Sequence, residues 1–133
     1  MTQLARQEFH VGERWCYRTP VGFERSRIVI GAVFRFEQLE PVVACAVTDA
    51  PRPLPDGTLE IVTIPFLPMT AGALQQTVIE QDGLGDLPPG FAPAFREWQD
   101  DPRGLAAFTV PFEGRLDHLI AREMAAIVKR AVV

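Results

Sequence analysis

The sequence predicts an α+β fold, in which an antiparallel β-meander curls toward a small SH3-like barrel and three helices follow at the C-terminal side. Three observations support this prediction. Residues 12–66 contain four strand-like segments, of which 25–39 alternates apolar and polar side chains; residues 69–131 mainly space apolar residues as helices do; and short or stiff turns separate the strands. The 133 residues are predicted to form one domain, with the sheet mainly in 12–66 and the helices mainly in 69–131.

The first two strands are expected on either side of the turn TPVGFE. The first covers residues 15–18 and buries Trp15 and Tyr17 on one face. The second covers residues 25–39, where Gly31 predicts a bulge or a bend. Its expected core face consists of alternate residues, namely Ser26, Ile28, Ile30, Ala32, Phe34 and Phe36.

The third and fourth strands complete the predicted meander. Residues 41–50 are apolar on both faces, which places this strand at the centre of the sheet. A stiff connection that ends in Pro55-Asp56-Gly57 leads to a fourth strand at 58–66, where Pro65 is expected to end the pairing. Because these connections are short or stiff, successive strands are predicted to pair as antiparallel neighbours.

The first helix is expected within MTAGALQQTVIEQDG, residues 69–83. Thr70 is its predicted N-cap, since threonine hydroxyls accept hydrogen bonds from the first helical turn. Gly83 or Gly85 is predicted to end it. Its apolar stripe is expected to contain Leu74, Val78 and Ile79.

Two further helices and a short strand are expected in the rest of the chain. Residues 91–101 place three aromatic side chains on one helical face, at Phe91, Phe95 and Trp98. Residues 105–110 are predicted to form a fifth strand. Residues 111–131 then predict a long last helix, whose apolar stripe would help to cover the sheet.

Charge is distributed unevenly along the chain. Residues 1–37 hold six arginines and four glutamates, a net charge of +2, whereas residues 38–133 hold seven basic and thirteen acidic groups, a net charge of −6; together they give −4. If the first two strands pair, five guanidinium groups share one surface and form a candidate anion-binding face, made of Arg14, Arg18, Arg25, Arg27 and Arg35.

The competing interpretation of this arginine face is a solvated outer side of the sheet. Glu13, Glu24 and Glu37 would then be the cross-strand partners of the arginines. We favour this interpretation, because antiparallel sheets commonly turn one polar face to water.

No motif for catalysis or metal binding is present. The candidate metal ligands are His10, His118, Cys16 and Cys45, and their spacing matches neither a C-x2-C nor an H-x3-H pair. We therefore expect no metal, no cofactor and no catalytic residue, and we expect both cysteines to be free thiols.

Three classes of function remain open. The leading hypothesis is a non-catalytic binding or interaction module, whose partner is a protein or a small anionic ligand. The alternative is a small enzyme or metabolite binder with a pocket between sheet and helices that uses Tyr17, Trp98 and His118. A homo-oligomer with a structural role is the third class.

The sequence also argues against two classes of partner and predicts a location. Nucleic acid is not expected as a partner, because an acidic chain binds phosphate backbones poorly. A membrane partner is not expected either, because no apolar run approaches the roughly 18 residues that span a bilayer. With no secretory signal at the N-terminus, the expected location is the cytoplasm.

Several short motifs resemble those of a known group. The segments GERWCYRTP, IPFLPMTAGAL and FAPAFREWQDDPRGLAAFTVPFEGRLDHLI look like a group of small uncharacterised bacterial proteins, with a G-[DE]-R-W-x-Y-R start and later F-x-x-x-[YF]-x-x-W and G-x-A-x-F-[TS] segments. This resemblance covers most of the chain and implies a cytoplasmic bacterial protein. It implies no activity, so no site residue is carried over from it.

Overall fold

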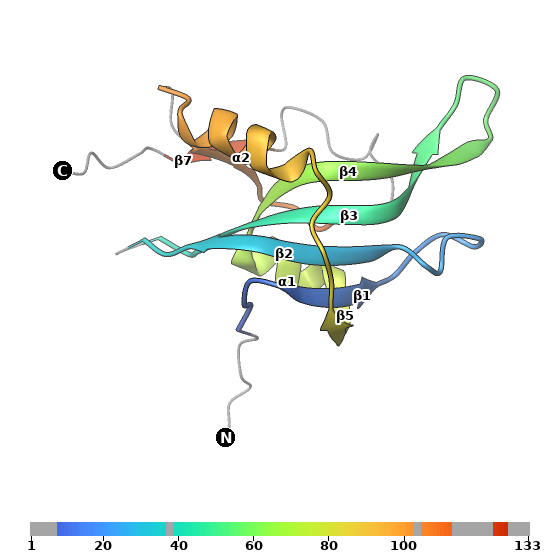
Figure 1. Cartoon of the computed structure of the whole chain (residues 1–133), viewed down its shortest axis with the longest axis horizontal. Coiled ribbons are helices and arrows are strands. Elements are labelled where there is room, and N and C mark those ends of the chain that lie inside the picture. Colours follow the sequence, from blue (N-terminus) through green and yellow to red (C-terminus); the bar gives the residue numbers. More distant parts are fainter. Residues whose placement is uncertain (1–7, 37–38, 103–104, 113–123, 128–133) are drawn as a thin grey trace.

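The structure is a computed structural model that describes residues 8–36, 39–102, 105–112 and 124–127. Over these residues it is mostly β, with a seven-stranded sheet of order β5-β1-β2-β3-β4-β6-β7 and two helices (Figure 1). The strands are β1 (Glu13–Tyr17), β2 (Arg27–Phe34), β3 (Val42–Pro53), β4 (Leu59–Thr70), β5 (Val78–Leu84), β6 (Leu105–Phe108) and β7 (Met124–Ile127). The helices are α1 (Ala71–Thr77) and α2 (Phe91–Gln99).

The first four strands form the predicted antiparallel meander, and β3 lies at its predicted central position. The expected SH3-like barrel is wrong, because the described sheet stays open, with β5 and β7 as its two edges. After β4 the chain adds strands at both sides: β5 pairs antiparallel with β1, and β6 pairs parallel with β4. Strands added at opposite edges extend a sheet instead of joining those edges.

The helix expected over residues 69–83 is much shorter than predicted. Its N-cap is confirmed, since the Thr70 hydroxyl accepts a hydrogen bond of 3.2 Å from the backbone N–H of Ala73. The helix ends at Thr77, and the chain continues as strand β5, so the predicted glycine stop is wrong. The β-branched side chains of Val78 and Ile79 favour a strand, and β1 offers the backbone partner that makes one.

The long last helix is also wrong where the structure describes it. Residues 124–127 form β7, which pairs antiparallel with β6 through Ala106 and Ala126, among other pairs. The sequence Met-Ala-Ala-Ile suits a helix or a strand, and the neighbouring strand decides between them. Residues 113–123 and 128–131 of the predicted helix lie outside the described residues. The expected α+β fold with three C-terminal helices is therefore wrong.

The fourth strand does not end at Pro65 as predicted. It continues to Thr70, and Pro65 lies in an irregular step of the ladder between the pairs Val47–Ile64 and Cys45–Leu67. At this step two residues of β4 face one residue of β3, which is the arrangement of a β-bulge. A bulge tolerates proline because the extra residue makes no regular ladder hydrogen bond.

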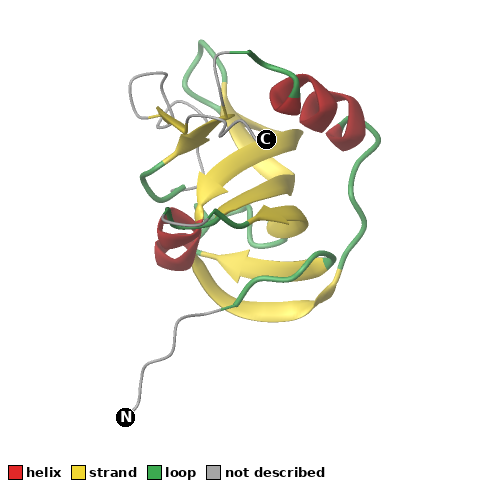
Figure 2. Ribbon diagram, turned by 90° about the vertical axis from the view of Figure 1, so that its left-hand side faces the viewer, coloured by secondary structure: helices red, strands yellow, loops and turns green. Residues whose placement is uncertain are grey.

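The two faces of the sheet carry different layers (Figure 2). Helix α1 and Phe112 cover one face, where they join a buried cluster made of Phe9, Trp15, Tyr17, Ile28, Ile30, Val43, Cys45, Val47, Ala50, Ile64, Leu67, Met69, Ala73 and Leu74. Helix α2 covers the opposite face with the predicted aromatic residues. Phe95 and Trp98 lie 5.7 and 5.5 Å, ring centre to ring centre, from Phe34 of β2.

The predicted bulge at Gly31 is confirmed, and it has a consequence for both faces. The pairs Ile30–Cys45 and Ala32–Ala44 leave Gly31 as an extra residue in β2. Ser26, Ile28 and Ile30 are buried as expected. Beyond the bulge the alternation inverts, so Phe34, predicted for the core face, contacts α2 instead.

Candidate functional site

Two of the five predicted site arginines converge on a carboxylate of β5. Nε of Arg27 lies 2.8 Å from Oδ2 of Asp82, and Nη2 of Arg14 lies 3.5 Å from the same oxygen. Nε of Arg14 also donates a hydrogen bond of 2.8 Å to the backbone carbonyl of Asp82. The hydrogen bond from Arg27, followed by the charge of Arg14, holds the pKa of Asp82 below its usual value. These arginines therefore join β1 and β2 to β5.

The glutamates expected as arginine partners have other roles in the described chain. One Glu13 carboxylate oxygen accepts a hydrogen bond of 3.1 Å from the Trp15 indole. The Glu24 carboxylate accepts hydrogen bonds from the backbone N–H of Gly22 within its own turn. Glu37 lies outside the described residues. Asp82, which the sequence predicts to lie in a helix, pairs with Arg14 and Arg27 instead.

Arg35 lies on the opposite side of the sheet from Arg27, because the bulge at Gly31 lies between them. It lines a cavity of about 240 Å³ together with Val33 and Val43, both of which pack in the α1-side core. The prediction that Arg27 and Arg35 point the same way is therefore wrong, and the structure does not assemble all five arginines on one surface.

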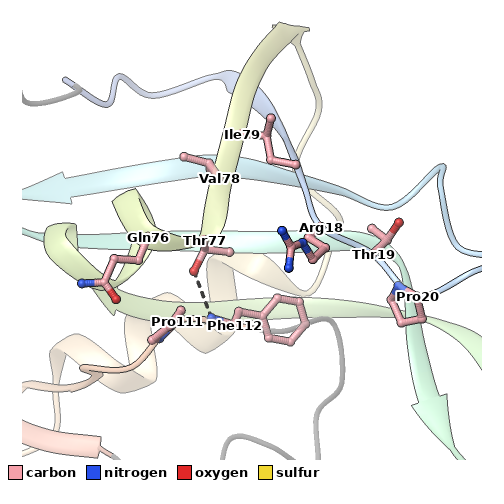
Figure 3. Close-up of a pocket in the computed structure, with 9 residues that line it drawn as sticks. All are labelled: Arg18, Thr19, Pro20, Gln76, Thr77, Val78, Ile79, Pro111 and Phe112. Carbon is pink, nitrogen blue, oxygen red and sulfur yellow. Dashed lines mark hydrogen bonds between the residues drawn. The ribbon is translucent and has the colours of Figure 1, made fainter.

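The two remaining arginines flank the turn between β1 and β2. The guanidinium groups of Arg18 and Arg25 are exposed and make no ion pair or hydrogen bond with other described residues. Arg25 lines neither the cavity of Arg35 nor that of Arg18. Arg18 lines an open cavity of about 620 Å³, and Figure 3 shows its guanidinium directed into this space.

The Arg18 cavity is the space enclosed by the ends of β1 and α1, the start of β5 and the segment after β6. Its lining consists of Arg18, Thr19, Pro20, Gln76, Thr77, Val78, Ile79, Pro111 and Phe112. Arg18, Thr19 and Gln76 contribute polar groups to this lining. The ring of Phe112 and the aliphatic side chains of Val78 and Ile79 contribute its apolar part (Figure 3).

Hydrogen bonds hold the apolar part of the cavity in place. The Thr77 hydroxyl donates a hydrogen bond of 2.7 Å to the carbonyl of Ala73, and it accepts one of 2.9 Å from the backbone N–H of Phe112. The ring of Phe112 packs at 5.3 Å, centre to centre, from the buried ring of Tyr17. The Thr77 hydroxyl is thus engaged on both sides, and Arg18 is the charged residue in the lining of the cavity.

The sequence pattern predicts Arg18 as a site residue but does not predict the rest of this site. The run Thr77-Val78-Ile79 was assigned to a helix, although three successive β-branched residues were a local signal for its end. Phe112 lies 35 residues after Thr77, its hydrogen-bond partner. A local sequence pattern does not predict a contact between residues so far apart in the chain.

The residues named for the alternative pocket are not brought together. The hydroxyl of Tyr17 lies 2.7 Å from Ser26 Oγ in the core on the α1 side. The indole of Trp98 donates a hydrogen bond of 2.7 Å to the carbonyl of Ala106 on the α2 side. His118 lies outside the described residues.

The described residues contain no group of three or more His, Cys, Asp or Glu side chains that would hold a metal ion. Cys16 and Cys45 are free thiols, as predicted, and burial raises the pKa of the Cys45 thiol. Among the helices of the described chain, none has the length and apolar character needed to cross a membrane.

Comparisons with known proteins return no match: no family model, no curated protein and no solved structure is significantly similar to this chain. The resemblance to small bacterial proteins therefore stays a prediction. Function has to be inferred from the geometry of the Arg18 cavity.

Proposed function

We propose that this chain is a non-catalytic binding module that holds a small organic anion in the Arg18 cavity. One observation carries the proposal: a guanidinium without a partner among the described residues is directed into a cavity that Val78, Ile79 and Phe112 also line. An arginine in this setting binds a carboxylate through two parallel N–H donors. The apolar body of the same ligand would lie against Phe112.

The other predicted arginines are less suited to this role. Arg14 of β1 and Arg27 of β2 already form ion pairs with Asp82. Arg35 lines its cavity together with Glu8 and Glu40, whose carboxylates repel an anion. Arg18 is therefore the arginine that combines a cavity with an unopposed positive charge.

The size and composition of the cavity support a small amphipathic ligand. Its volume of about 620 Å³ is comparable with known ligand sites, which span roughly 300–1,000 Å³. Arg18, Thr19 and Gln76 offer polar groups, while Ile79 and Phe112 offer apolar contact. A carboxylate on a short hydrocarbon body fits both kinds of wall.

Hexanoate and hexanamide make a matched test, because they share a hydrocarbon body and differ in charge. Hexanoate is expected to raise the thermal unfolding midpoint, since a ligand that binds only the native state stabilises it. Hexanamide at the same concentration is expected to have a much smaller effect. Arg18→Gln should abolish the difference, whereas Arg25→Gln, which removes a nearby exposed arginine outside the cavity, should preserve it.

A hexanoate response that persists in Arg18→Gln would contradict the proposal, and so would equal responses to the acid and the amide. Circular dichroism of both variants controls for folding. Arg18 is exposed and follows the last residue of β1, so its replacement is expected to leave the sheet intact.

We also propose the bacterial cytoplasm as the place of action. The free thiols of Cys16 and Cys45 support this location, because reducing compartments keep thiols from pairing. The resemblance of the sequence motifs to small bacterial proteins supports it as well. Fractionation of the native host, with detection by antibody, tests the location.

A further inference from the structure

Strand β5 is an edge strand with apolar and acidic side chains turned to solvent. It pairs with β1 on one side, and no described strand pairs with its other side (Figure 1). Ile79 is 62% exposed and Leu84 is 72% exposed. The strand has no lysine and no proline, two residues that proteins commonly use to protect such edges.

The Arg18 cavity lies at the N-terminal end of this edge. Val78 and Ile79 are the first two residues of β5, and both line the cavity (Figure 3). An extended peptide that pairs antiparallel with β5 would therefore reach the cavity with its own C-terminal residue. Its terminal carboxylate would arrive beside Arg18.

The charges along β5 select among extended partners. Its ionisable side chains are Glu80 and Asp82, both acidic. Asp82 is already paired with Arg14 and Arg27, so Glu80 is the carboxylate of β5 that a partner strand would face. A second copy of β5, paired antiparallel about Glu80, would place the two Glu80 carboxylates opposite each other, and like charges directly opposite each other destabilise a sheet. A peptide with basic side chains upstream of its C-terminus avoids this repulsion.

We propose that the chain binds the C-terminal tail of a partner protein, added as an extra strand antiparallel to β5. The terminal carboxylate pairs with Arg18, the last apolar side chain enters the cavity beside Phe112, and basic side chains of the tail lie near Glu80. This inference rests on the proposed function, because it identifies the anion in the cavity as a peptide carboxylate.

A fluorescein-labelled peptide of sequence KTKTTV tests the proposal by fluorescence polarisation. The free acid is expected to bind at least about tenfold more tightly than its carboxamide, as loss of one charge-assisted contact implies. Arg18→Gln should remove this preference, and Arg25→Gln should leave it unchanged.

Backbone pairing is tested with two further peptides, N-methylated at alternate amides in the two opposite phases. Only one set of alternate amides faces β5 in a strand, so one peptide should bind at least about tenfold more weakly and the other about as well as the parent. This comparison leaves the protein unchanged, so no variant has to fold. Reversing one charge by Glu80→Lys should weaken binding of KTKTTV and strengthen binding of ETETTV.

The outcomes separate this inference from the proposed function. If hexanoate binds through Arg18 but both N-methylated peptides bind like the parent, or KTKTTV does not bind, strand addition is overturned and the anion site stands. If neither hexanoate nor the peptide depends on Arg18, both proposals fail. A dimer in light scattering that KTKTTV does not dissociate would assign the edge to a second copy and overturn the inference.

Discussion

Replacing Gly31 by alanine tests how closely α2 packs on the sheet. A Cβ at position 31 would lie 2.3 Å from Cζ of Phe91, whereas ordinary contacts lie at 3.4–4 Å, so the ring would have to move by about 1 Å. Phe91 is 5% exposed, and its ring packs 5.4 Å from that of Phe95 and 5.7 Å from that of Phe66. Movement of the Phe91 ring toward Phe95 or Phe66 is therefore opposed by those rings.

The expected cost of Gly31→Ala follows from this geometry. Overpacking of a filled core costs about 1–3 kcal/mol, and we take ~2 kcal/mol for this site. The entropy of unfolding for 133 residues is ~0.28 kcal/mol/K at about 2.1 cal/mol/K per residue. The unfolding midpoint should therefore fall by about 7 °C, measured by circular dichroism or calorimetry.

The matched background for this test is Phe91→Leu, which removes the three ring atoms nearest to position 31, Cζ, Cε1 and Cε2. In that background Gly31→Ala should cost less than about 1 kcal/mol, so the two substitutions are expected to be non-additive. A neutral Gly31→Ala, or a cost that is the same in both backgrounds, would refute the packing of Phe91 over Gly31.

Two further predictions concern polar contacts. Asp82→Asn removes the carboxylate shared by Arg14 and Arg27 and should destabilise the protein near pH 7. Because the folded-state pKa of Asp82 is lowered, its stabilisation is complete above the unfolded pKa of about 4 and is lost as the pH falls through the folded value. The stability difference between the two proteins should thus shrink in urea titrations as the pH falls from about 4 through the lower folded-state pKa, and a constant difference at all pH values would contradict this. Tyr17→Phe removes the 2.7 Å hydrogen bond to Ser26 and should lower the free energy of unfolding by about 1 kcal/mol in urea titration, whereas an unchanged value would show that this buried bond contributes nothing.

The candidate site was predictable only in part. Arg18 was named because it lies in an arginine-rich segment, but the same reasoning named four other arginines that have different environments. A one-dimensional pattern cannot show that Asp82 neutralises Arg14 and Arg27, since Asp82 reaches them from a strand 68 residues after Arg14. The inversion of faces after Gly31 likewise separates Arg35 from the rest, although the bulge itself was predicted.

The sequence by itself determined the features that depend on near neighbours. Strand-like segments joined by short or stiff turns predicted the four-stranded meander, and the spacing of Phe91, Phe95 and Trp98 predicted the face of α2 that packs on the sheet. Only the tertiary structure decided that residues 78–84 and 124–127 form strands. Val78 and Ile79 favour a strand and Met-Ala-Ala-Ile suits either structure, but in both segments a neighbouring strand supplies the hydrogen bonds. The open sheet and the Arg18 cavity follow from those long-range pairings, which local periodicity does not contain.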